Sequence, residues 1–257
     1  MTQKRYTDNL DPQWIAQKLL IPTTLTHASQ STQLDAKEAI QKNTLAPHLF
    51  LANQQSAAKG RFSRPFFTKE DGGIYMSLYL DAQTSQQDPA TYTLMVASSI
   101  VKAIEHLTGI KTAIKWVNDI YLNDKKIAGI LTESLVEPET GEVYALIIGV
   151  GINFFIPNLP SPLSQKATSL FSAPPKISRN QLIVEIWRLF FKTPYHDLLK
   201  VYKDKSLVLG RTVSFHQNKK DYQGKAIDIT PFGSLVVQLD DHNITYLSSG
   251  EISLSSW

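Results

Sequence analysis

A lysine, an amide and a carboxylate lie close together near the middle of the chain. Lys115 and Trp116 come just before Asn118 and Asp119, within the segment 114–134. Lysine is a mobile point charge suited to a phosphate or a carboxylate, and Asn and Asp offer the oxygen ligands that magnesium prefers. In many sequences an Asn-Asp pair only shapes a turn, with a neighbouring Trp packed in the core. The segment is therefore a candidate anion site with a structural alternative.

A second group of cations lies in the segment 53–73. Lys59, Arg61 and Arg64 occur there around Gly60, next to a run of small residues. Cations on small-residue backbone suit a loop that wraps a phosphate, although charged runs more often simply face water. The segment lacks the G-x-x-x-x-G-K-[ST] pattern, and its glycines do not fit a dinucleotide fingerprint.

Two further segments offer weaker signals. Ser31, Thr32 and Gln33 precede a predicted helix, where they serve as ordinary capping residues or as partners for a small polar ligand. In the segment 149–154 two glycines permit close approach to the backbone, and Asn153 follows them. The six histidines show no metal-binding spacing, and no G-x-S-x-G hydrolase motif occurs. No side chain is assigned as a metal ligand.

The sequence predicts the helices and strands that must position these groups. Asp11 and Asp88 each stand before a proline and predict helix starts, the second helix ending at Gly109. A capping-box pair, Ser178 and Gln181, predicts another helix that Pro194 breaks or kinks. A further short helix is predicted over 34–43, and apolar runs predict strands over 48–54, 72–80 and 142–156.

The residue pattern of the sequence changes near Ser206, from mixed helix and strand signals to strand signals alone. Short strand-like runs then follow at 211–217, 222–230, 233–240 and 243–254, at roughly one per 8–12 residues, the spacing of a small barrel. We therefore predict an α+β domain over residues 1–203, with a mixed sheet flanked by helices, and an all-β domain over 204–257.

Composition excludes several classes of protein. The 257 residues are 42% hydrophobic and 19% charged, as expected for a globular chain with a real core. No apolar run is long enough to span a membrane, and the polar start lacks a secretory signal. The absence of cysteine excludes disulfides and thiol catalysis, which favours the cytoplasm. A net charge of +3 gives no argument for nucleic acid binding.

The order of the motifs resembles that of biotin protein ligases. Ser-Thr-Gln precedes a helix, a Lys-Gly-Arg loop precedes a strand, and a Lys-Trp-x-Asn-Asp hairpin closes in A-G-I-L before G-x-G-I-N. The resemblance covers roughly residues 28 to 255, and the hairpin is its most specific part. It implies a ligase domain like that of class II aminoacyl-tRNA synthetases, followed by a small SH3-like barrel.

The resemblance also implies an activity. Biotin and ATP are the substrates: the biotin carboxylate attacks the α-phosphorus, giving biotinyl-5′-AMP and pyrophosphate, with Mg²⁺ bridging phosphate oxygens. The partner is the biotin carboxyl carrier domain of a biotin-dependent carboxylase, whose lysine then receives biotin. A homodimer is possible, and no membrane partner is expected.

Roles for individual residues follow from the same resemblance. The expected catalytic cations are Lys115, between the carboxylate and the α-phosphate, and Arg61, on a loop that folds over the phosphates. Expected biotin contacts are Ser31, Thr32, Gln33, Gln55, Lys59, Gly60, Arg61, Lys115 and Gly129. Expected ATP contacts are Lys59, Arg61, Phe66, Trp116, Asn118, Asp119 and Asn153.

The sequence departs from the family pattern at several positions. Val117 stands where the hairpin usually has proline, and Phe66 where the loop usually has tryptophan. Ala58 replaces a loop glycine, and Lys59 replaces an arginine, which keeps the charge but loses the planar fork.

Three other functions are weighed against this one. A lipoate ligase or octanoyl transferase shares the catalytic domain, but its R-R-x-x-G-G-G-x-V-x-H-D stretch does not occur here. A DNA-binding repressor would place a winged helix before Ser31, and the 30 residues there are too few for one, so no DNA partner is expected. A catalytically inactive adaptor is disfavoured because Lys115 and Arg61 are both retained.

Overall fold

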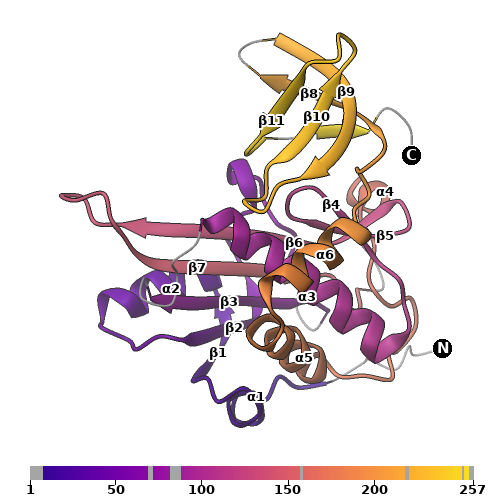
Figure 1. Ribbon diagram of the computed structural model, residues 1–257. Coiled ribbons are helices and arrows are strands. Elements are labelled where there is room, and N and C mark those ends of the chain that lie inside the picture. Colours follow the sequence, from indigo (N-terminus) through magenta and orange to yellow (C-terminus); the bar gives the residue numbers. More distant parts are fainter. Residues whose placement is uncertain are drawn as a thin grey trace.

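The computed structural model describes residues 8–68, 72–81, 88–156, 159–217, 220–250 and 252–254. A large mixed sheet carries helices on both faces, and a smaller antiparallel sheet lies beyond its β4–β5 end (Figure 1). The predicted fold class, a mixed sheet with flanking helices followed by a small β domain, is confirmed.

The large sheet has seven strands in the order β1-β2-β3-β7-β6-β5-β4. Only β1 and β2 run parallel, and every other neighbouring pair is antiparallel. The strands span Thr23–Ser29 (β1), His48–Gln55 (β2), Ile74–Asp81 (β3), Ala113–Lys115 (β4), Asp119–Leu122 (β5), Lys125–Val136 (β6) and Val143–Ile152 (β7).

Helices cover the two faces of this sheet unequally. The larger core lies on the face with α3 (Pro89–Thr108), α5 (Arg179–Lys192) and α6 (Tyr195–Asp204). The opposite face packs against α2 (Thr32–Gln41) in a smaller cluster. Strand alternation supplies both cores, since Leu49 and Leu51 enter the larger one and Phe50 the smaller. The remaining helical segments are α1 (Pro12–Leu19), α4 (Leu163–Lys166) and the 3₁₀ turn η1 (Arg61–Ser63).

The predicted helix signals act as expected. Asp11 and Asp88 accept backbone hydrogen bonds at the starts of α1 and α3, and Gly109 ends α3 in the left-handed conformation. Ser178 and Gln181 form both halves of the capping box of α5. These local signals are short-range, so the sequence alone is enough to read them.

Three elements differ from the sequence prediction. Strand β1 was not predicted, because TTLTHAS is a polar edge strand with few apolar residues. Pro194 was expected only to break or kink a helix, but it also caps a new one, α6. The run 243–254 is two strands, which Gly250 separates with a φ of +119°.

The smaller sheet has five antiparallel strands in the order β11-β10-β9-β8-β12. They span Thr212–Gln217 (β8), Lys220–Ile229 (β9), Leu235–Leu239 (β10), Ile244–Leu247 (β11) and Ile252–Leu254 (β12). The segment that leads into it also closes the edge of the large sheet. The amide of Ile114 donates to Lys205, and the amide of Leu207 donates to Ile114, each at 2.8 Å. Within the described ranges, no helix is both long and apolar enough to cross a membrane.

Candidate active site

A cavity of about 640 Å³ opens at the ends of the central strands. Its walls come from the start of α2, the end of β2, the loop 58–66, the β4–β5–β6 segment, β7 and the small sheet. With the exception of Asn153, every residue expected to contact biotin or ATP lines it. The fold thus brings to one place side chains that are spread over most of the sequence.

One end of the cavity is a network of hydroxyl and amide groups at the start of α2. The Oε1 atom of Gln55 accepts from the amide of Thr32 at 2.7 Å, and the Thr32 hydroxyl shares a 2.8 Å hydrogen bond with Ser77. Ser31 caps the helix by accepting from the amide of Gln33. Capping and ligand binding are therefore compatible roles for this motif.

Gln33 is held so that one of its polar atoms stays available. Its Nε2 atom donates to Glu133 at 2.8 Å, and Glu133 also pairs with Lys37 at 3.0 Å. Within the part of the chain that the structure describes, the buried Oε1 atom of Gln33 has no hydrogen-bond partner. A buried acceptor of this kind costs free energy until a donor reaches it, which suits a ligand N–H.

The two glycines of β7 make room for specific side chains. A Cβ atom on Gly149 would lie 3.0 Å from the Cδ atom of Gln33. A Cβ atom on Gly151 would lie 2.4 Å from the ring of Phe66, well inside contact distance. The close approach predicted from this motif therefore involves the floor of the cavity and one aromatic residue of the loop.

The hairpin presents a row of polar groups to the cavity. Asp119 and Lys126 form an ion pair with Oδ1 and Nζ 2.7 Å apart, and the Lys115 ammonium lies 5.9 Å from the centre of the Tyr121 ring. Burial, assisted by the charge of Asp119, raises the pKa of Tyr121 to about 12. Tyr121 is thus a neutral hydroxyl at physiological pH.

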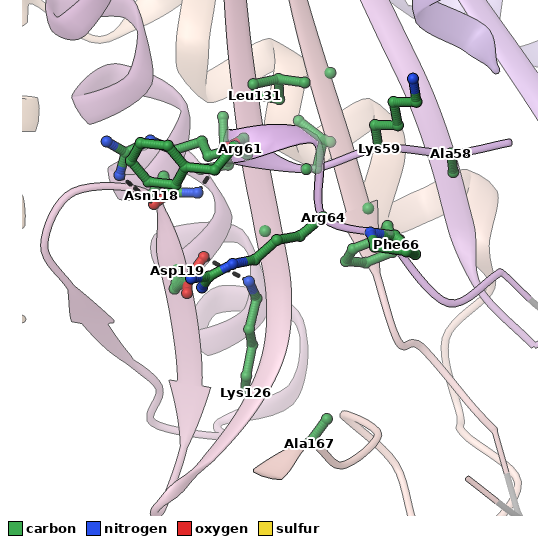
Figure 2. A pocket seen from close by; sticks show the side chains of 18 of the residues that line it. Ala58, Lys59, Arg61, Arg64, Phe66, Asn118, Asp119, Lys126, Leu131 and Ala167 are labelled. Atoms are coloured by element: carbon green, nitrogen blue, oxygen red, sulfur yellow. Dashed lines mark hydrogen bonds and ion pairs between the residues drawn. The ribbon is translucent and has the colours of Figure 1, made fainter. Parts of the chain in front are cut away.

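Lys126 is a cavity residue that the sequence prediction missed. A Cβ atom on Gly129 would lie 3.1 Å from the Lys126 Nζ atom and 3.7 Å from the Oδ1 atom of Asp119. Figure 2 shows Lys126 directed toward Asp119. The antiparallel register pairs Lys126 with Tyr121 across the hairpin. This pairing places Lys126 beside a cavity residue. A bulge between Ile120 and Tyr121 shifts the register, so the alternation of side chains along the sequence does not predict the pairing.

The basic loop lies across the cavity with its cations pointing in different directions. Arg61 donates to the Oδ1 atom of Asn118 at 3.2 Å, and Arg64 extends toward Asp119 (Figure 2). Lys59 points away from the Asp119–Lys126 pair. The exposed ring of Phe62 lies beside the Arg61 and Arg64 guanidinium groups, 5.1 and 6.0 Å from its centre.

Trp116 connects the cavity to the small sheet. Its ring is buried, and its indole nitrogen donates to the carbonyl of Gly233 at 2.9 Å. Behind it, the buried Tyr202 hydroxyl donates to the carbonyl of Val117 at 2.9 Å. The peptide bond between Trp116 and Val117 is cis. Strand β12 also contributes to the cavity wall, through Ile252 and Ser253.

Asn153 lies outside the cavity. Its amide donates to the carbonyl of Ile127 at 2.7 Å, and its Nδ2 atom donates to the carbonyl of Thr168 at 3.1 Å. Thr168 in turn donates its amide to Lys126, and the neighbouring Ala167 lines the cavity. In this structure Asn153 therefore orders the cavity wall from behind.

Ligands for a metal ion are sparse. Among the described residues, no cluster of three histidine, aspartate or glutamate side chains occurs. Asp119 is the carboxylate of the cavity wall, and Asn118 offers an amide oxygen beside it. This donor set fits a magnesium ion that takes most of its ligands from phosphates and water.

Two family models match the sequence. The model of the biotin/lipoate A/B protein ligase family matches residues 25–153, and that of the biotin protein ligase C-terminal domain matches residues 208–255. The bifunctional ligase/repressor BirA of Bacillus subtilis is 35% identical over 235 residues, which cover 87% of this chain and 71% of that protein. The biotin–[acetyl-CoA-carboxylase] ligase of Paracoccus denitrificans is 33% identical over 105 residues, 40% of this chain and 42% of its own length.

Solved structures share the fold. The biotin protein ligase from Aquifex aeolicus in complex with biotin and ATP superposes with a TM-score of 0.75 at 23% identity, covering 90% of this chain and 97% of its own. The biotin acetyl coenzyme A carboxylase synthetase from Helicobacter pylori gives a TM-score of 0.62 at 21% identity, covering 87% and 98%.

Proposed function

Because the chain belongs to the biotin/lipoate A/B protein ligase family, we propose that it activates biotin with ATP and transfers it to a carrier lysine. The products of the first step are biotinyl-5′-AMP and pyrophosphate. The second step acylates a lysine of the biotin carboxyl carrier domain of a carboxylase. The observation that carries this proposal is the single cavity in which the amide network, the hairpin and the basic loop meet.

Biotin is the preferred acid substrate. The ureido ring needs a donor and acceptor set, which Thr32, Gln33 and Gln55 supply at the start of α2. The match of residues 208–255 to a biotin ligase module also favours biotin over lipoate or octanoate, the runner-up substrates. The polar network favours biotin further, because an apolar acyl chain would leave the Gln33 acceptor unpaired.

Adenylation brings two anions together, so cations must stand between them. Lys115 keeps the role predicted for it, since it lines the cavity beside Tyr121. Lys126 is a second candidate for the same role, because its Nζ atom lies beside Gly129, an expected biotin contact, and Asp119, an expected ATP contact. The ion pair with Asp119 also holds the Lys126 side chain in position before substrates arrive.

The loop 58–66 covers the reacting groups. Arg61 reaches the phosphates from this loop once its bond to Asn118 is exchanged for the substrate. Lys59 turns inward as the loop closes, and Arg64, which already extends toward Asp119, adds to the positive field. Closure also keeps water from the reactive anhydride.

Magnesium enters with ATP as part of the substrate. Asp119 is the carboxylate in reach of a phosphate-bound ion, with Asn118 beside it. Bound there, the ion offsets phosphate charge during adenylation. Lys126 then exchanges part of its pairing with Asp119 for the phosphate.

Pyrophosphate release is the deciding measurement. We expect release that requires biotin, ATP and magnesium together, followed by labelling of a purified carrier domain. Release with lipoate or octanoate but not biotin would instead assign the runner-up activity. A cytoplasmic location, a homodimeric assembly and the absence of DNA binding remain predictions, which fractionation, sedimentation and a gel shift respectively test.

A further inference from the structure

A second cavity, of about 180 Å³, lies beside the first. The two cavities share a wall formed by Arg61, Asn118, Ile130 and Leu131. The rest of its lining is Pro89, Ala90, Thr93, Val117, Thr132 and Ser248. It therefore lies between the first turn of α3, the middle of β6 and the small sheet, on the far side of the Arg61–Asn118 pair.

The partition between the cavities includes a side chain that moves in the proposed reaction. Arg61 donates to Asn118 at 3.2 Å, and this contact is part of the shared wall. When Arg61 turns to the phosphate of the bound adenylate, that contact is given up. Loop closure over the large cavity therefore opens the wall toward the small one.

The small cavity suits an alkyl amine. Carbon-rich side chains of Pro89, Ala90 and Val117 form part of its lining, and the Thr93 and Thr132 hydroxyls share a 2.8 Å hydrogen bond. Among the described residues that line it, none is an aspartate or glutamate, and Arg61 is the one lysine or arginine. Such surroundings favour an uncharged amine over an ammonium ion, because desolvation and a nearby cation both lower an amine pKa.

We propose that the second cavity is the passage through which the acceptor lysine reaches the adenylate. This inference rests on the proposed ligase function. The neutral amine nitrogen attacks the acyl carbon, and a carbon–nitrogen bond forms as the bond from that carbon to the phosphate oxygen breaks. AMP leaves with the electron pair, and the extra proton on nitrogen passes to water, so the products are an amide, AMP and a proton.

Filling the passage separates the two steps of the reaction. Thr132→Phe places an aromatic ring at its wall, and phenylalanine has a high propensity for strands such as β6. We expect adenylate formation within about twofold of the original protein, and transfer from the preformed enzyme–adenylate complex to the carrier domain slower by about 10–100-fold. Hydroxylamine is small enough to enter by the large cavity, so its reaction with the adenylate stays within about twofold.

Two control variants test whether the added bulk inside the passage is what slows the transfer step. Thr132→Val removes the hydroxyl with little change in volume, and it should transfer biotin nearly normally. Val136→Phe adds the same bulk to the same strand, outside both cavities, and should leave both steps unchanged. If Thr132→Phe disturbs folding, Ala90→Leu fills the passage from the helix side and decides the question.

Each outcome bears on a different claim. Normal carrier transfer in Thr132→Phe and Ala90→Leu would overturn the passage. Equal slowing with hydroxylamine and with the carrier would show that the cavity serves general access to the adenylate, and a raised KM for ATP alone would assign it to the nucleotide. The absence of biotin-dependent pyrophosphate release in the original protein would instead overturn the proposed function itself.

Discussion

The indole nitrogen of Trp116 donates a 2.9 Å hydrogen bond to the carbonyl of Gly233, which ties the reactive hairpin to a turn of the small sheet. Gly233 occupies this turn with a φ of +85°, and a Cβ atom there would lie 3.3 Å from Ala90 of α3. The contact is buried and joins residues 117 positions apart. The small sheet therefore fixes the position of the strand that carries Lys115.

Removing this single hydrogen bond tests that coupling. Trp116→Phe should keep the fold and raise the KM for ATP about fivefold, as expected for the loss of ~1 kcal/mol. The matched control is Trp14→Phe, a tryptophan of α1 that packs against the larger core and does not line the cavity. Thermal unfolding and steady-state kinetics of both variants give the comparison. Equal KM changes in the two would mean that Trp116 acts only through stability.

Single-turnover adenylate formation distinguishes the roles of the two hairpin lysines that line the cavity, Lys115 and Lys126. Loss of a transition-state cation costs on the order of 10²–10³ in rate, and we expect this for Lys115→Ala. Lys115→Arg should recover part of the rate and Lys115→Gln little. Lys126→Ala is measured beside them, with Lys125→Ala as an exposed control on the same hairpin. A near-normal rate in Lys115→Ala with a large loss in Lys126→Ala would move the central role to Lys126.

Replacing Arg61 should impair a different step, the retention of the adenylate. Arg61→Ala removes the loop cation and its bond to Asn118, so biotin binds more weakly and the adenylate escapes before transfer. The expected result is faster adenylate release and indiscriminate labelling of lysines on bystander proteins. Arg211→Ala, an exposed arginine outside the cavity, is the control. Retention of the adenylate in Arg61→Ala would remove the loop from this role.

Gly151 and Phe66 should behave as a coupled pair. A methyl group on Gly151 would lie 2.4 Å from the Phe66 ring, so Gly151→Ala should displace the ring and the loop that carries it. We expect a roughly tenfold rise in the KM for ATP. The double variant Gly151→Ala, Phe66→Ala removes the clash and should recover part of the affinity. Additive losses would show that the two residues act independently.

Acid stability should depend on Glu185. Hydrogen bonds from Arg188, followed by one from His106, hold the pKa of the buried Glu185 carboxyl below its ordinary value of 4.5. Because the folded-state pKa is the lower one, the stabilisation is complete above pH 4.5 and is lost as the pH falls through the folded-state pKa. Glu185→Gln should cost ~1 kcal/mol at pH 7, and the cost should shrink as the pH falls through the folded-state pKa of Glu185.

Urea denaturation across this pH range makes the measurement. The control is Glu139→Gln, an exposed carboxyl in the turn between β6 and β7, which should change stability little. A difference between Glu185→Gln and the original protein that is independent of pH would exclude the charge as its source.

Local chemistry made much of the fold predictable. Caps such as Asp88 and Ser178 act through neighbouring backbone groups, and the apolar run of β7 reflects burial on both faces. Strand β1 was missed because its partner β2, and not its own residues, makes it a strand. The motif order placed Gln33, Arg61 and Asn118 near one site, but it carried no information about Lys126, which depends on a bulge in the hairpin.

The closed edge of β4 has a consequence for the order in which the protein is made. The backbone of Ile114 hydrogen-bonds to Lys205 and Leu207, and the indole of Trp116 hydrogen-bonds to the carbonyl of Gly233. A chain emerging from the ribosome presents the hairpin before those residues exist, so β4 keeps an open edge until Lys205 and Leu207 have followed. The hairpin that carries Lys115 therefore reaches its final position only after the segment from Lys205 to Gly233 has been made.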